Sequence, residues 1–403
     1  MNGFKRLIFF QNGLQERSGH FLPETRLWRE AVLGAGMAWH GFSSTRLDPR
    51  IAAEIGVDPS VPILPGQKKT DLSQLSCLAA FLEFPDILCS ILQQKFPGTP
   101  SASDLLFVPY ATEVEMMGVA KLLSGVAMEN RPAVAFMFHH PAHEWETDSS
   151  TMTIRGDFTR FQYAAGLLKM ISPNVRYYGV IPILSQELSR ILGSPVGTLP
   201  WASQLPHQGY QRCNAPRWDV AIPGSGRVEQ GFGLWPQIHS VLRRIRPESK
   251  MLFQVSGKNQ EKLFRAAVIQ EENTHNTSIA HATPDRISHI SLLDSCRLIL
   301  LPYLPSIYAL RGSGIFTEVC SLGKPVVAHS QTPMGRMIRA GLAAGITFQE
   351  HTASSIANAV DEALSRIEQL ERRAQELSPV WRDRHDVTNI LRNLTADFAN
   401  QPA

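Results

Sequence analysis

This sequence has little net charge, few cysteines and no long apolar run. The 39 Lys and Arg residues nearly balance 36 Asp and Glu, and a net charge of +3 does not favour a nucleic-acid-binding protein, which would cluster its basic residues. The five cysteines show no CxxC or other metal-binding spacing, which favours structural thiols in a reducing cytosol. No stretch approaches the roughly 18 apolar residues of a membrane-spanning helix. We therefore expect a cytoplasmic protein that has no nucleic-acid partner and makes at most a peripheral contact with the inner face of a membrane.

Length and composition indicate a globular protein of two domains. The chain has 403 residues, more than one hydrophobic core usually holds, and its 43% apolar and 19% charged residues are ordinary for a folded protein. The apolar run RLIFF near the N-terminus is too short for a secretory signal and is typical of a first strand instead.

Short apolar runs alternate with helical patterns along most of the chain, which predicts an α/β fold with mainly parallel sheets. The segment 200–218 is rich in Pro, Gln and Gly and interrupts the alternation, so we expect it to link two similar α/β domains. Region 39–103 has little periodicity and is expected to be helical decoration or a mobile loop. Near the C-terminus, one long helix is predicted over 354–377 and a final helix over 380–399.

A glycine-rich loop, GSGRVEQG at 224–231, follows a predicted strand and opens a helix. Its glycines lack the G-x-G-x-x-G spacing of a dinucleotide fingerprint, so an ordinary tight turn is one interpretation. Arg227 favours another interpretation, because a guanidinium beside a helix N-terminus can bind a phosphate bidentately.

The stretch RGSGIFTEV at 311–319 offers a second loop of this kind. The backbone N–H groups of Ser313, Gly314 and Ile315 would lack helical acceptors and, together with the helix dipole, would attract an anion. Glu318 returns to the same helix face one turn later and suits a pair of vicinal hydroxyls, such as those of a ribose. The alternative is a surface glutamate that only complements the helix dipole.

Histidines gather at the end of a predicted strand in FHHPAHEW, 138–145. Ligands of open α/β sheets bind at that edge, so His139 is a candidate catalytic or substrate-orienting residue and His140 a candidate acceptor-side residue. Pro141 opposes a regular helix that would align two histidines on a metal ion, and we predict no metal site. A polar loop of hydrogen-bonded histidines is the third interpretation.

A small-residue loop also follows the first strand, in QERSGHF at 15–21. Ser18, Gly19 and His20 would lie at the carboxyl edge of that strand, where ligands bind. They are candidate acceptor-side residues, or else the plain start of a helix.

Several of these segments resemble motifs of the GT-B glycosyltransferases, in particular of the retaining "glycosyl transferases group 1" family. VAIPGSGRVEQGF (220–232) resembles the strand and loop that carry the donor-phosphate arginine. The block 296–332 resembles the family's donor-site strand, loop, helix and strand. NGLQERSGHFLPETRLWREA (12–31) resembles its first glycine loop, and PVGTLPWA (195–202) resembles the strand that closes its first domain.

The resemblance implies two Rossmann-like domains whose parallel sheets face each other across a cleft, with a C-terminal helix that crosses back to the first domain. Residues 1–203, with the returning helix 380–403, would bind the acceptor, and residues 204–379 would bind the nucleotide-sugar donor. The catalytic residues implied are His139, Arg227 and Glu318. The donor-binding residues implied are Gly224, Arg227, Tyr303, Arg311, Ser313, Gly314, Ile315 and Glu318.

Two positions depart from the family pattern. Gln230 stands where the family often has a lysine, and Leu310 stands where it often has a glutamate, which leaves Arg311 as a candidate replacement cation. The function implied is a hexosyltransferase-like enzyme of glycan biosynthesis that takes its sugar from a UDP- or GDP-sugar. It would need no metal or cofactor, would retain configuration, and would use a glycan, lipid-linked or small-molecule acceptor. The alternatives are a GT-B nucleotide-sugar epimerase and an inactive nucleotide-sugar-binding homologue.

Overall fold

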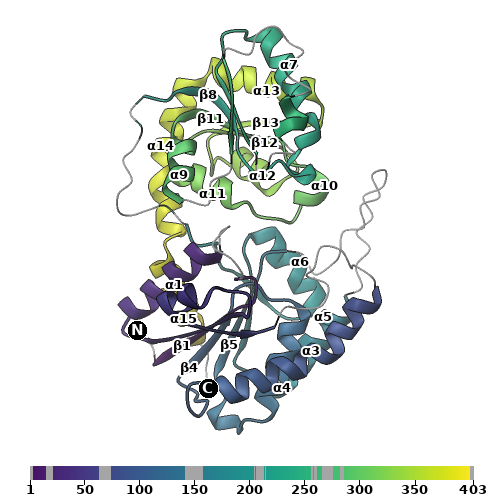
Figure 1. Cartoon of the computed structure of the whole chain (residues 1–403), viewed down its shortest axis with the longest axis vertical. Helices are drawn as coiled ribbons and strands as arrows, with labels where there is room; N and C mark the ends of the chain where they lie inside the picture. The colour runs from purple at the N-terminus through teal and green to yellow at the C-terminus, as the bar shows by residue number, and fades with distance from the viewer. Residues whose placement is uncertain are drawn as a thin grey trace. The chain divides into compact units, whose positions relative to one another are not determined.

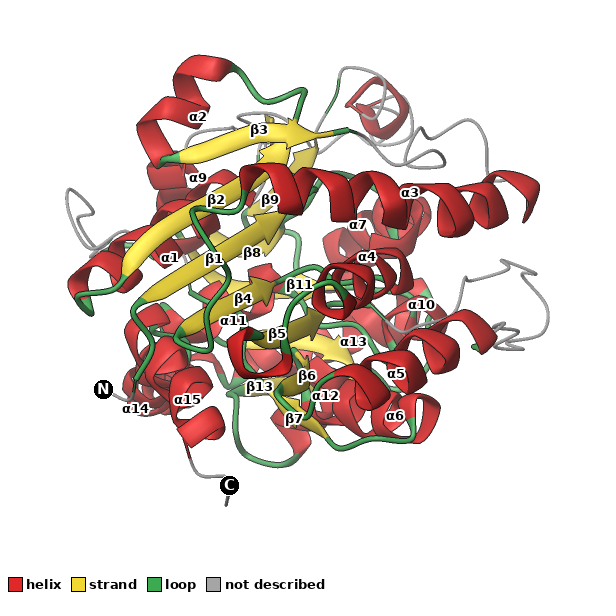
Figure 2. Ribbon diagram, turned by 90° about the horizontal axis from the view of Figure 1, so that it is seen from below, coloured by secondary structure: helices red, strands yellow, loops and turns green. Residues whose placement is uncertain are grey.

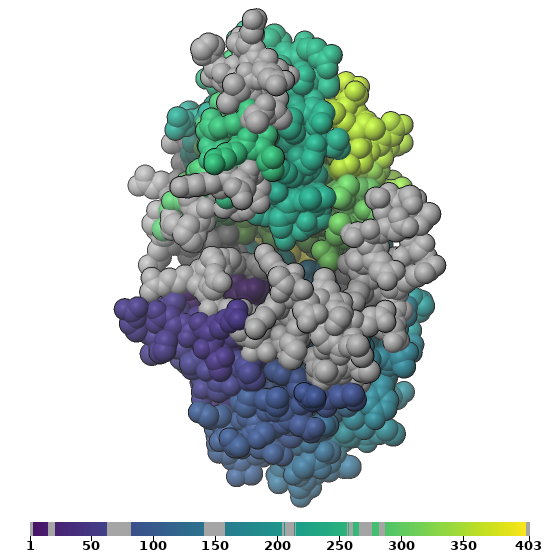
Figure 3. Space-filling model, turned by 45° about the vertical axis from the view of Figure 1, so that its right-hand side comes forward, coloured from purple at the N-terminus to yellow at the C-terminus, as the bar shows by residue number. Residues whose placement is uncertain are grey.

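The computed structural model divides into two compact units, which are described separately (Figure 1). Unit 1 comprises Met1–Ala202 and Val387–Ala403, and unit 2 comprises Ser203–Asp386. Figure 3 shows the described residues in colour on one face of the molecule. The structure describes residues 3–14, 21–62, 74–140, 158–203, 205, 213, 215–255, 257, 261–265, 276–281 and 286–399, so part of the predicted linker lies outside it.

Within its described residues, unit 1 is built on a parallel sheet of seven strands in the order β3-β2-β1-β4-β5-β6-β7 (Figure 2). Strands β4 and β5 are buried along their whole length, as expected where helices cover both faces of a sheet. The strand order reverses between β1 and β4, which is the switch point where ligands of such sheets bind. The strands are β1 (Arg6–Gln11), β2 (Ala38–Ser44), β3 (Val57–Val61), β4 (Asp104–Val108), β5 (Ala133–Phe138), β6 (Val175–Gly179) and β7 (Val196–Thr198).

Helices pack on both faces of the unit 1 sheet (Figure 2). Helices α3, α4 and α5 lie side by side on one face, and α1 packs against α15 on the other. Local chemistry fixes several ends: Thr112 and Glu115 form a capping box at the start of α4, and Gly56 ends α2 in the left-handed conformation. The helices are α1 (Phe21–Gly34), α2 (Pro49–Ile55), α3 (Gln74–Lys95), α4 (Glu113–Ser124), α5 (Thr159–Ile171), α6 (Pro182–Leu192) and α15 (Val387–Ala399).

Region 39–103 contributes two strands to the sheet, which the expectation of helical decoration or a mobile loop missed, while α2 and α3 in its described part are helical as expected. Strands β2 (AWHGFSS) and β3 (VDPSV) contain polar residues and a proline, which hid the apolar pattern. Pro59 is tolerated because β3 lies at the edge of the sheet, where a missing N–H donor breaks no central ladder.

Within its described residues, unit 2 is built on a parallel sheet of six strands in the order β10-β9-β8-β11-β12-β13. The order reverses between β8 and β11, so the loops after these strands lie at the second switch point. The predicted α/β fold with parallel sheets is therefore confirmed in both units. The strands are β8 (Trp218–Ile222), β9 (Met251–Val255), β10 (Thr277–His281), β11 (Cys296–Leu301), β12 (Val326–His329) and β13 (Gly345–Phe348).

Two apolar cores lie on opposite faces of the unit 2 sheet. One core joins the sheet to α7 and α13 through residues such as Trp235 and Val360. The other joins it to α9, α11 and α14 through residues such as Phe316 and Trp381. The helices are α7 (Trp235–Ile245), α9 (Arg286–Asp294), α10 (Pro305–Tyr308), α11 (Gly314–Ser321), α12 (Pro333–Arg339), α13 (Ala353–Ser365) and α14 (Ile367–Arg384).

The C-terminal helices differ in their bounds from the prediction. The helix predicted over 354–377 is two helices, α13 and α14, that meet at Arg366, and α14 continues through Pro379, where the sequence had suggested a break. The last helix, α15, belongs to unit 1, as expected: Tyr178 donates to Asp397 (3.1 Å between Oη and Oδ2) and α15 lies beside α1 (Figure 1). None of the described helices is long and apolar enough to cross a membrane.

Candidate functional site

Two of the four predicted loops and the first residues of a third, 138–140, fall within the described residues, and they lie at the carboxyl edges of strands. The loop 224–231 follows β8, the segment 311–314 comes after β11 and α10, and His139 directly follows β5. Ser18, Gly19 and His20 lie outside the described residues, as do His143 and Glu144. The functional roles of all these residues stay predictions.

Gln230 organises the glycine loop after β8. Its Oε1 accepts hydrogen bonds from the backbone N–H of Ser225 (3.0 Å) and of Arg227 (3.4 Å), and its side chain is buried. Gly224 makes room for this contact, because its φ of 143° suits glycine and a Cβ there would come within 2.8 Å of the Gln230 oxygen. Where the family resemblance raised the expectation of a lysine, the chain thus has a buried acceptor that holds the loop and adds no charge.

Two guanidinium groups of unit 2 lie in one electrostatic neighbourhood. Arg227 pairs with Glu229 (3.1 Å between Nη1 and Oε1) while its side chain stays half exposed. Burial lowers the pKa of Arg311 from its ordinary value, Arg227 lowers it further, and Tyr308 and Glu229 oppose the change. The loop after β8 and the segment after β11 therefore share a charged region that holds Arg227, Arg311 and Glu229.

Tyr303 lies at the centre of this region. It is buried, its hydroxyl is 3.5 Å from Ser313 Oγ, and its ring centroid is 4.3 Å from that of Tyr308. Burial raises the pKa of Tyr303 well above its usual range, and both Arg227 and Glu318 act on it electrostatically. One tyrosine therefore connects the arginine side of the site to the acid on α11.

The N-terminus of α11 is capped but not closed. Ser313 is the N-cap residue, and its Oγ accepts a hydrogen bond from the N–H of Phe316 (3.2 Å). The amides of Gly314 and Ile315 belong to the first turn, which has no acceptors inside the helix, and both residues are partly exposed. The helix start therefore has amides at its first turn, and the binding of an anion there stays a prediction.

Glu318 is held by a partner that sequence reasoning missed. Its Oε2 lies 3.2 Å from Nε2 of His289, a residue of α9. The other ring nitrogen of His289 lies 3.5 Å from Gln254 Nε2, and Gln254 Oε1 accepts the N–H of Gly224 (3.1 Å). A chain of polar contacts thus links the acid on α11 to the glycine loop, and the buried Glu318 is not a surface glutamate that only complements the helix dipole.

A second cluster of aromatic and titratable groups lies at the carboxyl edge of the unit 1 sheet. The Tyr110 hydroxyl donates to Glu24 Oε2 (2.6 Å), and the Tyr110 ring stacks on His139 with 3.8 Å between centroids and 16° between planes. Trp201 packs edge-on against His139 (4.7 Å between centroids). Glu24 and His139 are buried, whereas His140 is exposed. The structure therefore brings the predicted His139 together with Glu24, which was not predicted.

Replacing Glu24 by glutamine should change how stability depends on pH. Burial raises the pKa of Glu24 from 4.5 to about 7, although hydrogen bonding with Tyr110, Trp28 and Trp201 opposes the rise. Between these values the native protein binds more protons than the unfolded chain, so its free energy of unfolding falls as pH rises from about 4.5 and levels off above about 7. The full effect is about 3 kcal/mol.

Chemical denaturation of the wild type and Glu24→Gln at pH 5 and pH 8 measures this. The variant should gain stability relative to the wild type at the higher pH. If the free energies of unfolding of the two proteins change by the same amount between pH 5 and pH 8, the raised pKa of Glu24 is contradicted.

Solved structures resemble this chain along nearly its whole length. No family model and no curated protein matches the chain. A glycosyltransferase from Rickettsia africae has a TM-score of 0.65 at 12% identity, over 99% of this chain and 100% of that chain. The chain has the GT-B fold. Anabaena HepE in complex with UDP-glucose gives a TM-score of 0.61 (12% identity; 98% of this chain, 100% of that chain). UDP-GlcNAc 2-epimerase from Neisseria meningitidis, bound to UDP-GlcNAc, gives 0.59 (12% identity; 98% and 100%).

Neither unit of this GT-B chain brings metal ligands together within its described residues, where no group of three or more His, Cys, Asp and Glu side chains could hold a metal ion. The cations in the charged region of unit 2 are arginines. A weak sequence signal existed for two of the residues that were missed: His289 stands near the start of the helix before β11, and Glu24 stands in the helix after β1. Gln254 gave no signal, because it lies inside an apolar strand.

Proposed function

We propose that this protein is a glycosyltransferase that takes a sugar from a nucleoside-diphosphate donor bound to unit 2. The observation that carries the proposal is the gathering of Arg227, Arg311 and the N-terminus of α11 around the paired rings of Tyr303 and Tyr308, with Glu318 one turn inside the helix. Cations and open amides suit a diphosphate, and a buried carboxylate suits the hydroxyls of a ribose.

The proposed transfer breaks the bond between the sugar C1 and the diphosphate oxygen and forms a bond between C1 and an acceptor hydroxyl oxygen. The acceptor proton passes to the departing diphosphate, so the products are a glycoside and a protonated nucleoside diphosphate. Negative charge grows on the leaving group, and Arg227, Arg311 and the α11 amides stabilise it without a metal ion. Departure and attack on the same face of the sugar would retain configuration.

Glu318 and His289 form the proposed ribose clasp. Because His289 Nε2 faces Oε2 of Glu318 at 3.2 Å, it orients the carboxylate and limits its rotation. In unit 1, His139 is proposed to orient a hydroxyl of the reacting sugars, since an imidazole can donate or accept a hydrogen bond. The acceptor proposed is a glycan, a lipid-linked sugar or a small hydroxylated molecule.

Two solved structures of the same fold support a UDP-sugar as the first donor to test. HepE contains UDP-glucose, and the N. meningitidis epimerase contains UDP-GlcNAc. The second of these also supports the alternative function, a nucleotide-sugar epimerase, which would use the same diphosphate contacts.

The test is a thermal-shift screen of the whole protein against UDP-, GDP- and ADP-sugars, followed by release of nucleoside diphosphate with and without an acceptor panel. One nucleotide sugar should raise the melting temperature in a concentration-dependent manner. Glu318→Gln should weaken that binding by roughly 10- to 100-fold, the value of hydrogen bonds to a charged group. Glu371→Gln is the matched control, because Glu371 pairs with Arg297 elsewhere in unit 2 and should leave binding unchanged.

The possible outcomes separate the alternatives. Acceptor-dependent release of diphosphate supports the transferase, and recovery of a C2 epimer from donor alone identifies the epimerase. Binding of a nucleotide sugar without any conversion indicates an inactive homologue. Absence of binding across the panel, or an unchanged affinity in Glu318→Gln, contradicts the donor site itself.

A further inference from the structure

Glu24 is a buried acid with no part in the proposed transfer. It lies in α1 with 0% of its surface exposed, so no substrate can touch it. A carboxyl group in such a place is costly unless a partner compensates it, and an apolar residue would fill the same position at less cost. Trp28 and Trp201 also act on it, and its main hydrogen-bond partner is Tyr110, in the loop between β4 and α4, at 2.6 Å. The contact therefore joins two elements that are 86 residues apart in the chain.

The Tyr110 ring in turn determines what surrounds His139. It lies flat against the imidazole at 3.8 Å, and Trp201 closes a second side at 4.7 Å in an edge-on arrangement. A phenol ring that is anchored only by packing could slide or rotate about χ1. A phenol whose hydroxyl is also bound to a buried carboxyl has one permitted position, because the hydrogen bond fixes the far end of the ring.

We propose that Glu24 is a positioning residue for His139: by holding the Tyr110 hydroxyl it keeps the phenol ring stacked on the imidazole and so fixes the plane in which His139 meets a sugar hydroxyl. The catalytic consequence rests on the proposed function, whereas the positioning itself does not. Among the described residues of the strand-end loops, Tyr110 is the titratable group that contacts Glu24, and His139 stacks behind it. Glu54 of α2 pairs with Arg26 of α1 (2.6 Å), both largely exposed, and Asp397 of α15 accepts from Tyr178.

The experiment is nuclear magnetic resonance of the whole protein labelled in its 13 histidine rings, with the His139 signals assigned by their loss in His139→Gln. A stacked tyrosine ring shifts the imidazole proton signals upfield. Glu24→Leu and Tyr110→Phe should each remove much of that shift, and the double variant should remove no more than either alone, because both break one contact. Glu24→Gln keeps an acceptor for the hydroxyl, so it should preserve the upfield shift while it removes the part of the pH dependence near pH 7 that Glu24 causes.

Asp104→Asn is the matched control. Asp104 is a buried acid of the same unit that pairs with Arg6 at the start of β4, so its loss affects stability but should not move the His139 signals. The inference is overturned if His139 signals are unchanged in Tyr110→Phe, or if Asp104→Asn changes them as much. Because Tyr110→Phe removes one oxygen atom only, it keeps the test decisive even if Glu24→Leu does not fold.

Turnover provides a second arm. If a donor and acceptor are found, Tyr110→Phe and Glu24→Leu should lower kcat by about tenfold or more with little change in the KM for the donor. Glu24→Gln should keep most of the wild-type kcat below pH 7. If the His139 signals move in the variants as expected but the wild-type protein shows no turnover, the proposed function is contradicted and the positioning role stands. Turnover that is unaffected in all three variants would contradict the positioning role and leave the proposed function intact.

Discussion

Replacing Arg311 by alanine should lower the turnover number for a nucleotide-sugar donor by about 10²- to 10³-fold, the usual loss when one preorganised donor to a developing anion is removed. Arg311 is partly buried beside Arg227, and burial strengthens the interaction of a cation with a diphosphate because less water screens it. Arg227 is half exposed and already paired with Glu229, so Arg227→Ala should cost less than Arg311→Ala. Steady-state release of nucleoside diphosphate measures both effects.

Arg297→Ala is the control for Arg311→Ala. Arg297 forms a bidentate pair with Glu371 at the outer face of unit 2 and faces none of the groups around Tyr303. This variant should keep wild-type turnover and wild-type affinity for the nucleotide. Wild-type kinetics in Arg311→Ala would show that Arg311 does not replace the missing lysine, and Arg227 would then be the one described arginine assigned to the diphosphate.

The fold could be predicted from sequence because its signal is repeated along the chain. Strands β4, β5 and β11 are mostly apolar and, apart from Arg297 in β11, buried on both faces, and such burial leaves a recognisable run of apolar residues. Strand β3 at the edge of the sheet and its neighbour β2 are only partly buried, and their polar residues removed the pattern. The prediction that the helix ends before Pro379 was wrong for a different reason. Helix α14 is long and packed, and the neighbouring turns of a packed helix can tolerate the loss of one N–H donor.

In the candidate sites, too, some features could be predicted from the sequence and others could not. Gly314 and Glu318 are four residues apart in one helix, so their shared face could be predicted from helical spacing. The partners His289 and Gln254 come from a different helix and a different strand, and only strand order brings them to Glu318. Gln230 could be recognised as a missing cation, but its function as an acceptor for loop amides depends on the backbone conformation at Gly224.

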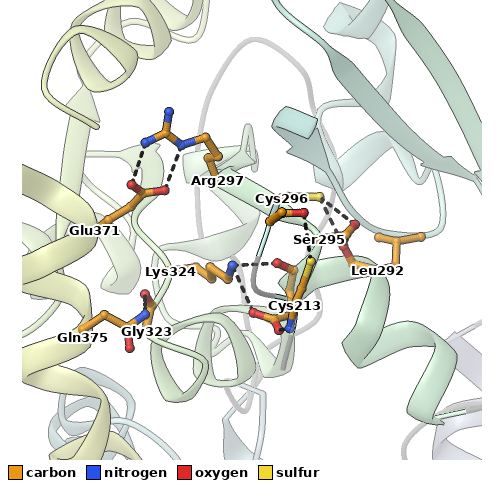
Figure 4. Close-up of polar contacts among 11 residues, drawn as sticks. Cys213, Leu292, Ser295, Cys296, Arg297, Gly323, Lys324, Glu371 and Gln375 are labelled. Carbon is orange, nitrogen blue, oxygen red and sulfur yellow. Dashed lines mark hydrogen bonds and ion pairs between the residues drawn. The ribbon is translucent and has the colours of Figure 1, made fainter. Parts of the chain in front are cut away.

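Replacing Lys324 by methionine should destabilise unit 2 by about 3–5 kcal/mol, because it leaves a buried charge without its partner. Lys324 Nζ lies 3.0 Å from Asp294 Oδ1 and donates to the Asp294 carbonyl oxygen (2.6 Å), and both side chains are buried (Figure 4). Asp294 Oδ2 also accepts the N–H of Cys213 (2.6 Å), so this acid holds a segment that precedes β8. Chemical denaturation measures the loss of stability, and hydrogen exchange of the β11 and β12 amides in the native protein locates it.

The pair formed by Arg297 and Glu371 is the surface counterpart (Figure 4). Both side chains are about one third exposed, so Arg297→Met should cost about 1 kcal/mol or less. An equal cost for Lys324→Met and Arg297→Met would mean that burial does not decide the strength of these contacts.

The double variant Lys324→Met/Asp294→Asn distinguishes a lost attraction from an uncompensated charge. If the methionine variant is unstable because it leaves the Asp294 carboxylate ionised in an apolar site, an asparagine there removes the charge and still accepts the Cys213 amide. The double variant should then be more stable than Lys324→Met alone, a non-additivity that only a direct interaction produces. If the two substitutions instead add, the contacts of Lys324 and Asp294 with the backbone, and not the ion pair, hold β12 to the end of α9.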